Sequence, residues 1–466
     1  MHPLVVKKLL LPLHERMLHR GTFEVLRGLE QSQWWPTDRL RALQQGKLRR
    51  LLTRAHDRCP FYRRRIDEAG IDPARITLDQ LSRLPTLTKS DITENRDAMI
   101  DPSVRGGLHD CATGGSTGVP LAFKIDRERQ AADQAARART RRWFGIDVGE
   151  RELYLWGSPV ELAAVDHVKA IRDRLTNHRL LNAFRMTPRV MSGFLDEIRR
   201  FDPVHIFGYP SSIARLVRHA IACGRSIQSR SLRAVFVTGE LFQASDRAVI
   251  EESVTVPVVD GYGAREAGFI AHQCPAGTYH VTMESLIVEL LHPTGDAHAP
   301  LTNRQSSIGN RQSATPVATG EPGEITITHL DAYGMPFIRY RTGDIARHAT
   351  ADCPCGRGLE ALDIIEGRRT DMLRTSAGGV AHALSVIYVL RDEPTVREFK
   401  VVQQSNLDLD VLIIPRGPFE ETCRRRITES LKRQIGRDID VRIQLTEEIQ
   451  PDPSGKHRYV VSHNEG

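Results

Sequence analysis

The middle of the chain alternates short strand-like runs with helical stretches, and this pattern constrains the fold more than any other feature. Apolar, β-branched or aromatic runs over 153–156, 205–209, 234–238 and 256–260 predict strands. Helical periodicity between them is clearest over 211–223. Strands that alternate with helices are typical of a largely parallel sheet with helices on its faces. The sequence therefore predicts an α/β fold.

The last hundred residues again contain predicted strands and a helix, which indicates a separate small domain. We expect three parts: a basic helical N-terminal segment over 1–70, a large multi-sheet α/β domain over 71–366, and a small mobile α+β C-terminal domain over 367–466. In the large domain, strands are also predicted at 286–291 and 324–329. In the small domain, strands are predicted at 399–402, 407–414 and 441–445, together with a helix at 419–435.

Four shorter predictions concern segments outside these strands. Leucines spaced near 3.6 residues, with Arg and Lys opposite, predict one helix over 39–65, and a helical turn is expected at 79–84. The side chain of Thr88 or of Ser90 can accept a hydrogen bond from an exposed backbone N–H group, which predicts a helix start there. Residues 301–320 are rich in Ser, Thr, Asn, Gln and Gly without periodic apolar residues, which predicts a mobile loop.

The net charge of +7, from 65 Lys and Arg against 58 Asp and Glu, is concentrated at one end of the chain. Residues 1–70 hold 15 basic and 7 acidic residues, a net of +8, so the remaining chain nets −1. A uniformly basic surface for nucleic acid is therefore not expected. Lys7 and Lys8 interrupt the apolar runs of residues 1–13, which fits neither an export signal nor a membrane span. We expect a short amphipathic helix there, in a cytoplasmic protein.

A glycine-rich stretch, Thr113-Gly-Gly-Ser-Thr-Gly-Val-Pro120, carries the strongest functional signal. Glycines let several backbone N–H groups converge on phosphate oxygens, and the hydroxyls of Thr113, Ser116 and Thr117 add donors. The stretch is not the GxxxxGK[ST] loop, because Val119 stands where that pattern needs Lys. Taken alone, such a stretch also fits an ordinary turn.

Five further motifs follow in order along the chain. They are Val237-Thr-Gly-Glu240, Asp260-Gly-Tyr-Gly-Ala-Arg-Glu266, Arg339-Tyr-Arg-Thr-Gly-Asp344, Gly367-Arg-Arg-Thr-Asp371 and Gly455-Lys456. With the glycine-rich stretch they resemble the motifs of the adenylate-forming ligases, which include the acyl-CoA synthetases. The closest likeness is to phenylacetate–CoA ligase and its capsular-polysaccharide-associated relatives. That likeness rests on Cys59-Pro-Phe-Tyr62, Leu84-Pro-Thr-Leu-Thr88 and Met335-Pro-Phe-Ile-Arg-Tyr-Arg341.

The resemblance implies a large domain that binds ATP and a carboxylic acid. Adenylation joins a carboxylate to the α-phosphorus of ATP and expels pyrophosphate, so the site must neutralise charge and hold the reactants in line. The glycine-rich stretch would clamp the departing phosphates. The residues that the resemblance assigns to the nucleotide are Thr113, Gly114, Gly115, Ser116, Thr117, Gly118, Gly239, Glu240, Tyr262, Gly263, Asp344 and Arg368.

Four of the implied roles are specific. Glu266 would hold Mg²⁺, a hard cation that prefers oxygen ligands. Tyr262 would lie beside adenine, and Asp344 would accept both ribose hydroxyls, which suit the two oxygens of a carboxylate. Arg368 would reach the ribose or the phosphates. Considered singly, each residue also fits a structural role, such as a surface charge, a core aromatic or a turn.

The small domain would act as a lid that carries the catalytic lysine. By resemblance, the ammonium of Lys456 would bridge the substrate carboxylate and the α-phosphate. The lid would rotate after adenylation about a hinge at Thr370 and Asp371. The family pattern at this hinge is Gly-Arg-x-Asp-Asp, and here Thr370 replaces the first Asp.

Cysteines suggest a second kind of site. Cys353 and Cys355 form a close pair, and Cys274 and His280 lie upstream. Thiolates with an imidazole suit tetrahedral Zn²⁺, and some members of the resembled subfamily carry a zinc centre here. We expect a structural zinc site, with His272 as an alternative to His280; two reduced cysteines in a loop are the other interpretation. The remaining Cys59, Cys111, Cys223 and Cys423 are expected to be packing residues.

The function implied by the resemblance is ATP- and Mg²⁺-dependent formation of an acyl adenylate, followed by transfer of the acyl group to CoA. An amine or a carrier-protein thiol is an alternative acceptor, and a degenerate member that only binds a partner in a polysaccharide or secondary-metabolite pathway is an alternative of another class. The basic prefix has two interpretations. It is a solvated helix face, or residues 1–34 form a docking surface for an anionic membrane, for the CoA phosphates or for the second subunit of a homodimer. The expected walls of the acid pocket are Tyr209, Pro210, Ser211, Phe236 and Gly261.

Overall fold

We describe a computed structural model of the chain, which divides into two units. The larger comprises Met1–Thr294, Ser307–Thr342 and Ala346–Ile365, and the smaller comprises Gly295–Ser306, Gly343–Ile345 and Glu366–Gly466. Of the predicted site residues, Gly114–Gly118, Thr370, Asp371 and Lys456 lie outside the described residues, as does the side chain of Arg368. The predicted loop 301–320 is described only from residue 315. The structure describes residues 1–113, 121–156, 172–183, 186–292, 315–368, 372–376, 380–382, 386–387, 389–390, 393–450 and 459–463.

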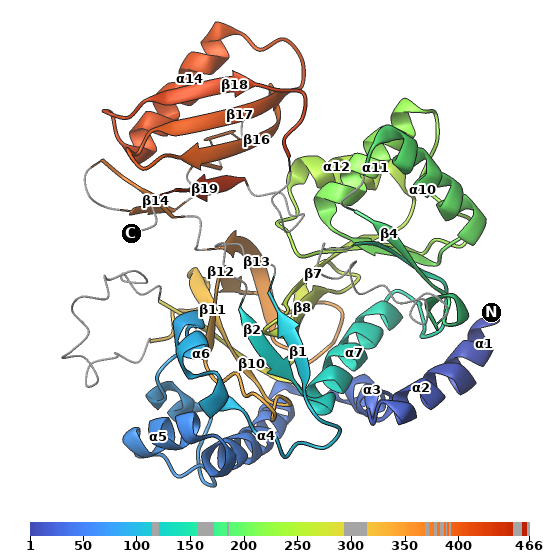
Figure 1. Cartoon of the computed structure of the whole chain (residues 1–466), viewed down its shortest axis with the longest axis vertical. Helices are drawn as coiled ribbons and strands as arrows, with labels where there is room; N and C mark the ends of the chain where they lie inside the picture. The colour runs from blue at the N-terminus through green and yellow to red at the C-terminus, as the bar shows by residue number, and fades with distance from the viewer. Residues whose placement is uncertain are drawn as a thin grey trace. The chain divides into compact units, whose positions relative to one another are not determined.

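An eleven-stranded sheet forms the centre of the larger unit (Figure 1), in the order β10-β11-β12-β13-β9-β8-β7-β6-β5-β3-β4. The sheet is parallel from β7 to β4, and β7 and β8 then pair antiparallel. The α/β prediction is therefore confirmed, because β3, β5, β6 and β7 correspond to the strands expected from the alternating pattern, whereas β4 was not predicted. Their bounds are β3 Glu152–Trp156, β4 His178–Asn182, β5 His205–Gly208, β6 Ala234–Thr238 and β7 Val258–Ala264.

Helices α10, α11 and α12 cover one face of the parallel strands (Figure 1). Alternate strand residues such as Leu155, Ile206 and Val235 are buried with Leu195 of α10 and Val217 of α11 in one apolar cluster. This packing is what the helical periodicity of these segments requires. The helices on this sheet are α7 Arg127–Arg142, α10 Pro188–Phe201, α11 Pro210–Ala222 and α12 Ala244–Ser253.

The other half of the sheet is built from mainly antiparallel strands. Its strands pack on a second, larger apolar cluster that includes Tyr340 and Phe337. A separate two-stranded hairpin joins β1 His109–Ala112 to β2 Ala122–Ile125, on either side of the glycine-rich stretch. The remaining strands of this half are β8 Gly268–Gln273, β9 Tyr279–Val281, β10 Leu286–Leu291, β11 Gly323–His329, β12 Tyr340–His348 and β13 Ala361–Arg368.

Two boundaries differ from the sequence predictions. The helix expected over 39–65 is two helices, α4 Thr37–Arg58 and α5 Pro60–Glu68, because Pro60 disfavours helical geometry at Cys59, which is extended. The strand expected at 256–260 instead runs from Val258 to Ala264, since its end pairs with β8 through a local irregularity after Tyr262. The predicted helix start at Thr88 is confirmed: a reciprocal capping box joins Thr88 and Asp91.

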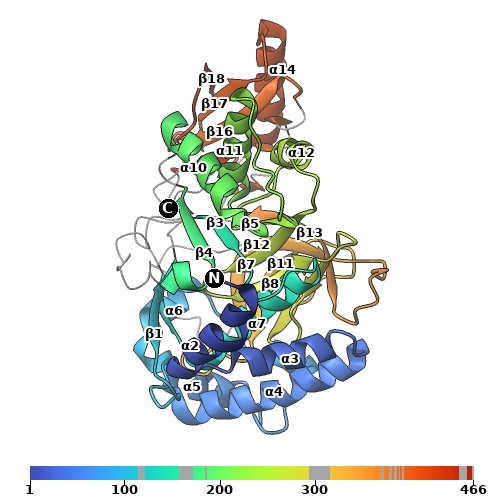
Figure 2. The same cartoon turned by 90° about the vertical axis from the view of Figure 1, so that its right-hand side faces the viewer.

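The basic prefix packs into the larger unit. Leu48 and Leu52 of α4 belong to the same buried cluster as Phe337. Helix α3 Thr22–Ser32 lies on α7, where Leu26 and Leu29 meet two alanines (Figure 2). The short helices that complete this part of the chain are η2 Asp79–Arg83, α6 Lys89–Asn95 and η3 Asp97–Met99.

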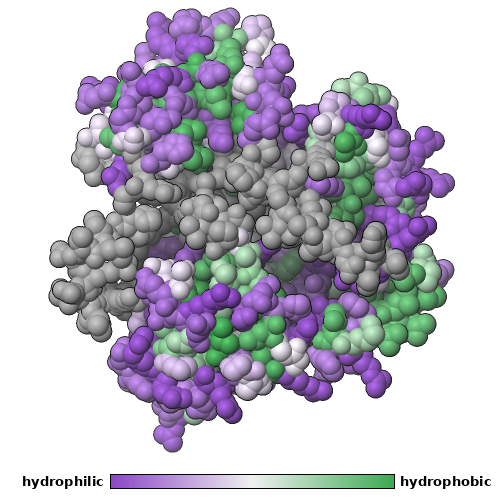
Figure 3. Space-filling view, viewed as in Figure 1, coloured by the Kyte–Doolittle hydropathy of each residue, from purple (hydrophilic) through white to green (hydrophobic). Residues whose placement is uncertain are grey.

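The first helical stretch leaves most of its apolar residues in solvent. It runs as α1 Pro3–Val5, a π-helical turn Val6–Leu10 and α2 Leu11–Met17. Leu9 and Leu13 are exposed, while Val6 is buried. In Figure 3 a hydrophobic area appears at the right-hand edge, where Figure 1 places α1 and α2. No described helix is long and apolar enough to cross a membrane.

The smaller unit is an α+β domain, as predicted. A four-stranded sheet in the order β18-β17-β16-β19 packs against α14 Glu421–Ile435. The helix buries Cys423, Ile427, Leu431 and Ile435, a stripe at a spacing of four residues. The strands are β14 Met372–Arg374, β15 Val380–His382, β16 Val396–Gln403, β17 Leu409–Pro415, β18 Val441–Leu445 and β19 Val460–Ser462.

Candidate nucleotide site and metal centre

The glycine-rich stretch begins and ends at one point of the β1–β2 hairpin. The backbone N–H of Thr113 donates to the Leu121 carbonyl over 3.0 Å, and the N–H of Leu121 donates to Thr113 Oγ1 over 3.0 Å. The segment between them, which includes the predicted phosphate-binding residues, lies outside the described residues. Thr113 therefore belongs to the hydrogen-bonded residue pair at the base of this segment, where the two strands of the hairpin meet.

The turn after β7 lies next to that base. Arg265 donates from Nη1 to the carbonyl of Ala112, the last residue of β1, over 2.9 Å. Its own carbonyl accepts a hydrogen bond from Arg129 of α7 over 2.6 Å. Burial lowers the pKa of Arg265. The motif that ends at Glu266 is thus attached to the hairpin that carries the glycine-rich stretch.

Two hydroxyl contacts join the same motif to β12. The Tyr340 hydroxyl donates to Glu266 Oε1 over 3.2 Å, and the Tyr262 hydroxyl donates to Thr342 Oγ1 over 3.4 Å. Tyr340 and Glu266 are both buried. Among the residues that the structure describes, Glu266 forms no ion pair; its buried carboxylate accepts the Tyr340 hydrogen bond, and Arg265 interacts with it electrostatically without direct contact. Such a carboxylate is costly to bury alone and suits a bound cation.

The rest of the motif on β12 ends at Asp344, which is buried. Gly343 has φ +83°, a left-handed conformation that favours glycine, just before this carboxylate. The backbone of Arg368 ends β13, the neighbouring strand of the sheet. The two residues predicted to reach the ribose therefore come from adjacent strands.

Aromatic rings lie at the carboxyl ends of β3 and β5. The Tyr209 ring, directly after β5, stacks on Trp156 at the end of β3 with centroids 4.0 Å apart. Gly239 follows β6 with φ +83°, and a Cβ there would approach the Tyr209 ring to 3.1 Å. The carboxyl ends of parallel strands meet at one edge, where ligands bind in open α/β sheets. Trp156 was missing from the predicted site, and its position at a strand end was the signal for it.

The other predicted pocket residues have well-defined neighbours. Glu240 Oε2 accepts hydrogen bonds from the Ser211 backbone N–H over 3.3 Å and from the Ser211 hydroxyl over 2.6 Å. These bonds satisfy donors at the start of α11. Phe236 is buried and meets Phe144 edge to face, with centroids 5.6 Å apart.

Two glycines of the 260–266 motif are required by close contacts. A Cβ on Gly261 would lie 2.5 Å from the ring of His272, and one on Gly263 would lie 2.5 Å from the carbonyl oxygen of Gly268. The β7–β8 hairpin therefore closes only with glycine at both positions.

Asp260, the first residue of this motif, is linked to β9. The Tyr279 hydroxyl donates to its carboxylate over 2.6 Å. Burial raises the pKa of Asp260 to about 6, despite the opposing effects of Tyr279 and Arg247. The neighbour of Tyr279 on β9 is His280, one of the predicted metal ligands.

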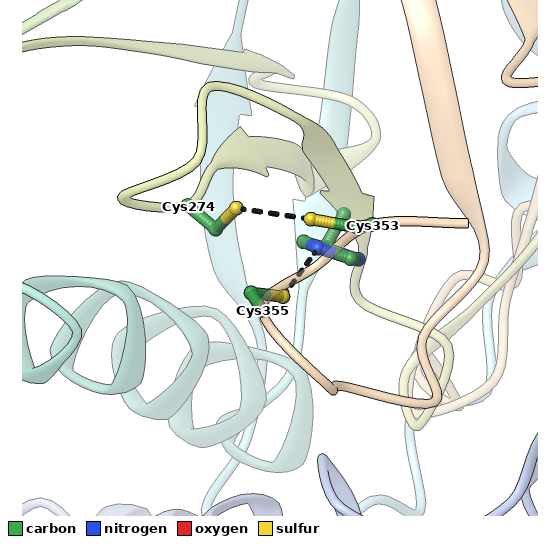
Figure 4. Close-up of side chains that lie close together, drawn as sticks. Cys274, Cys353 and Cys355 are labelled. Carbon is green, nitrogen blue, oxygen red and sulfur yellow. Dashed lines mark hydrogen bonds between the residues drawn. The ribbon is translucent and has the colours of Figure 1, made fainter. Parts of the chain in front are cut away.

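The four predicted metal ligands come together (Figure 4). One donor atom from each of Cys274, His280, Cys353 and Cys355 lies within 4.8 Å of all the others. Cys274 Sγ is 3.5 Å from Cys353 Sγ, and Cys355 Sγ is 3.1 Å from His280 Nε2. Ligands about 2.1–2.3 Å from a tetrahedral Zn²⁺ are themselves about 3.5–3.8 Å apart, so the cluster has the dimensions of a zinc site.

Backbone contacts hold these ligands in place. His280 Nδ1 lies 3.2 Å from the Leu359 carbonyl, which leaves Nε2 facing the thiols. The N–H of Ala276 donates to Cys274 Sγ over 3.3 Å within the β8–β9 turn. Burial lowers the pKa of His280, which favours the neutral imidazole that binds metals.

Two predictions are wrong: that His272 is an alternative metal ligand, and that Cys223 is a packing residue. His272 is not among the clustered donors; it pairs with Gly261 across β7 and β8 and stacks on Phe269. Cys223 is exposed, so it is not a packing residue, because it lies at the solvent-facing end of α11. Cys59 and Cys423 are buried, and Cys111 is partly buried.

Known proteins resemble this chain over most of its length. A family described as the CapK C-terminal domain matches residues 372–463. Phenylacetate-coenzyme A ligase of Thermus thermophilus is 25% identical over 418 residues, 87% of this chain and 85% of that protein. The Escherichia coli protein of the same name is 29% identical and covers 72% of each chain. The chain is thus similar over most of its length to phenylacetate–CoA ligases, and its C-terminal part matches the CapK C-terminal domain.

A solved structure supports this fold. A crystal structure of 2-hydroxyisobutyryl-CoA ligase, in the postadenylation state in complex with R3-HIB-AMP, superposes with a TM-score of 0.71. It is 21% identical and covers 94% of this chain and 92% of its own. The chain therefore shares its α/β fold with that protein.

Proposed function

We propose that this ligase uses ATP and Mg²⁺ to activate a small carboxylic acid as an acyl adenylate and then transfers the acyl group to CoA. The observation that carries the proposal is the position of the turn after β7. Arg265 contacts the base of the glycine-rich stretch, and Glu266 accepts a hydrogen bond from Tyr340 of β12. Three motifs that are far apart in sequence thus converge, as a nucleotide site requires.

In the first step, a carboxylate oxygen of the acid attacks the α-phosphorus of ATP and the bond to the β-phosphate oxygen breaks. Pyrophosphate leaves with that electron pair, and the acyl adenylate remains. We assign the glycine-rich stretch to the departing phosphates and Lys456 to the charge that builds on the carboxylate and α-phosphate. Tyr262 and Asp344 would bind the adenosine, and Arg368 would add a cation to the ribose or phosphates.

Glu266 would hold Mg²⁺, because it is a buried carboxylate without an ion-pair partner among the described residues. When bound there, the cation supplies neutralisation of phosphate charge. The Tyr340 hydroxyl would then orient the carboxylate from the protein side.

In the second step, the sulfur of CoA attacks the acyl carbon, the bond to the AMP oxygen breaks, and AMP leaves while the thiol proton is released. We propose that the domain over 367–466 turns about Thr370 and Asp371 between the steps, relative to the domain over 71–366. Thr370 replaces the first Asp of the family hinge, so the thiolation rate is the quantity most sensitive to this departure.

The stacked rings of Trp156 and Tyr209 are the proposed wall of the acid pocket, with Gly239 beside them and Phe236 and Gly261 on the neighbouring strands. Gly239 lies directly against the buried Tyr209 ring, because a Cβ there would approach it to 3.1 Å. An acid with a flat or small apolar group fits such a wall.

We further propose that Cys274, His280, Cys353 and Cys355 bind a structural Zn²⁺. Four protein donors close the coordination sphere and leave no position for substrate. The loop that carries Cys355 also carries Gly358, whose N–H donates to the Gln33 carbonyl over 3.0 Å. The centre would therefore fasten the loop on which the start of α4 rests.

A panel of carboxylic acids tests this proposal. Each acid is incubated with the full chain, ATP and Mg²⁺, and pyrophosphate release and hydroxamate formation are measured. Turnover with at least one acid supports adenylation. ATP binding without turnover for any acid would favour a degenerate member that only binds a partner. Adding CoA then separates the acceptors: conversion to the thioester supports the CoA proposal, whereas a persistent acyl adenylate points to an amine or a carrier-protein thiol.

Outside the reaction, we propose that residues 1–34 dock the ligase onto a partner. The sequence leaves an anionic membrane surface, the CoA phosphates and a second copy of this chain as candidates.

A further inference from the structure

The exposed face of the first helical stretch differs from the rest of the surface. Among the described residues, ten large hydrophobic side chains are exposed, and six of them lie within Met1–Met17. Their exposed fractions range from 41% to 64%, so these side chains are largely in solvent rather than at the edge of the core. The six residues are Met1, Leu4, Val5, Leu9, Leu13 and Met17.

Four of these residues follow one another at a spacing of four: Val5, Leu9, Leu13 and Met17. Four residues of an α-helix turn by about 400°, so such a row drifts by about 40° at each step. The π-helical turn Val6–Leu10 lies within the row. Because a π-turn holds more residues per turn, it offsets part of the drift and keeps the row on one side.

The opposite side of the helix is attached to the protein mainly by polar groups. Lys7 forms an ion pair with Asp147. Asn177 donates to the carbonyl oxygens of Met1 and Gly149 over 3.0 and 2.8 Å. A surface helix usually buries its apolar face and exposes its polar one. Here the polar attachments hold the helix with its apolar row outward.

Backbone geometry at the attachment leads to the same conclusion. Gly149 has φ +91°, and a Cβ there would lie 2.8 Å from the Pro3 carbonyl oxygen. The helix therefore sits directly on the Gly149 backbone. This contact fixes the side of the helix that faces the protein.

The charges beside the row select among partners. The exposed charged residues of 3–17 are Lys8 and Arg16, both cations. Glu15 is the one acidic residue of this stretch, and it is buried with Arg20 and Thr22 as its partners. A second copy packed on this face by two-fold symmetry would bring cations close to cations. Anionic lipid headgroups complement them, and acyl chains accept the apolar row.

We propose that Met1–Met17 is an interfacial helix that binds the surface of an anionic phospholipid membrane. Leu9, Leu13 and Met17 enter the boundary between headgroups and acyl chains, while Lys8 and Arg16 lie at the headgroups. The helix lies in the plane of the membrane and does not cross it. This inference does not depend on the ligase reaction.

Co-sedimentation of the full chain with vesicles tests the proposal. Phosphatidylcholine vesicles are compared with vesicles that also contain phosphatidylglycerol. We expect the wild type to bind the anionic vesicles, to bind the neutral ones several-fold less, and to lose affinity as salt is added. The double variant Leu9→Asp/Leu13→Asp should lose binding at least about tenfold, because charges enter the apolar face. Lys8→Glu/Arg16→Glu should abolish the preference for anionic vesicles.

Ile221→Asp is the matched control, since Ile221 is equally exposed but lies on α11. It should bind vesicles like the wild type. Melting temperatures establish that all variants are folded. Equal binding by the wild type and the Leu9→Asp/Leu13→Asp variant would overturn the proposal. So would a wild type that ignores anionic vesicles but forms a dimer that this variant dissociates, because the occupant would then be a second copy.

Discussion

Replacing Tyr340 by phenylalanine removes one oxygen atom from the candidate nucleotide site. The Tyr340 hydroxyl donates to Glu266 Oε1 over 3.2 Å, and both residues are buried. Phenylalanine fills nearly the same space, so the ring keeps its place in the apolar cluster with Phe337. The substitution therefore tests whether this hydrogen bond orients the carboxylate that we assign to Mg²⁺.

The expected magnitude follows from the geometry. Hydrogen bonds to charged groups contribute about 1.5–3 kcal/mol. A separation of 3.2 Å is longer than the roughly 2.5–3.0 Å usual between oxygens, so the lower end applies. A loss of about 1.5 kcal/mol corresponds to about tenfold in rate. We expect Tyr340→Phe to lower kcat/KM for MgATP about tenfold, and Glu266→Gln to lower it by about a hundredfold or more because the charge itself is lost.

Pyrophosphate release at varied MgATP measures both effects. In the Glu266→Gln background, adding Tyr340→Phe should have little further effect, since the hydrogen bond has lost its charged acceptor. Tyr333→Phe is the control. Tyr333 is also buried, but its hydroxyl accepts a hydrogen bond from Arg50 of α4 over 2.7 Å. That variant should lose stability and keep its kinetic constants.

Two results would refute this reasoning. If Tyr340→Phe leaves kcat/KM unchanged, the hydroxyl does not orient a working carboxylate. If it costs tenfold in both the wild-type and Glu266→Gln backgrounds, Tyr340 acts on some other group.

Three further variants test other parts of the site. Burial raises the pKa of Asp260 to about 6, so ionising this carboxyl group destabilises the fold as pH rises from about 4 to 6. Relative to the Asp260→Asn variant, the wild type should lose roughly 2–3 kcal/mol of stability across that range and nothing more above it. Equal melting temperatures of the two proteins at every pH would contradict this prediction. Metal analysis should find about one zinc per chain. The Cys353→Ser variant should lose the zinc and melt at a lower temperature, whereas the control Cys223→Ser should keep both its zinc and its melting temperature. A stable wild type without metal would refute the zinc centre. Lys456→Ala should reduce adenylation by orders of magnitude with ATP binding nearly intact, and unchanged turnover would remove the lysine from the mechanism.

Local patterns predicted most of the secondary structure. The parallel strands other than β4, α11, α14 and the helix start at Thr88 all follow from residues close together in sequence. Errors arose where a neighbour changed a local preference. Pro60 divided the predicted helix at Cys59, and pairing with β8 extended β7 to Ala264. The second effect was not visible in the sequence because the pairing partner had not been identified.

The candidate sites show the same division. The motifs named Glu266 and Asp344, but nothing local indicated that Tyr340 donates to Glu266 or that Trp156 stacks on Tyr209. These contacts join different strands, so they depend on the order of strands in the sheet. The ligand set of the metal centre was predicted from residue types and from the family resemblance, while the choice of His280 over His272 was decided by which donor atoms the fold brings together.

By itself, the sequence determined the α/β class, the order of the ligase motifs and the presence of an apolar periodicity in a basic N-terminal helix. Each of these properties is carried by short runs of residues that are close together in the sequence. Only the tertiary structure decided which side of that helix faces outward. Val6 is buried and Lys7 reaches Asp147, so Leu9 and Leu13 remain in solvent. Periodicity identifies a face but not its partner, because a partner is chosen by contacts between segments that are distant in the chain.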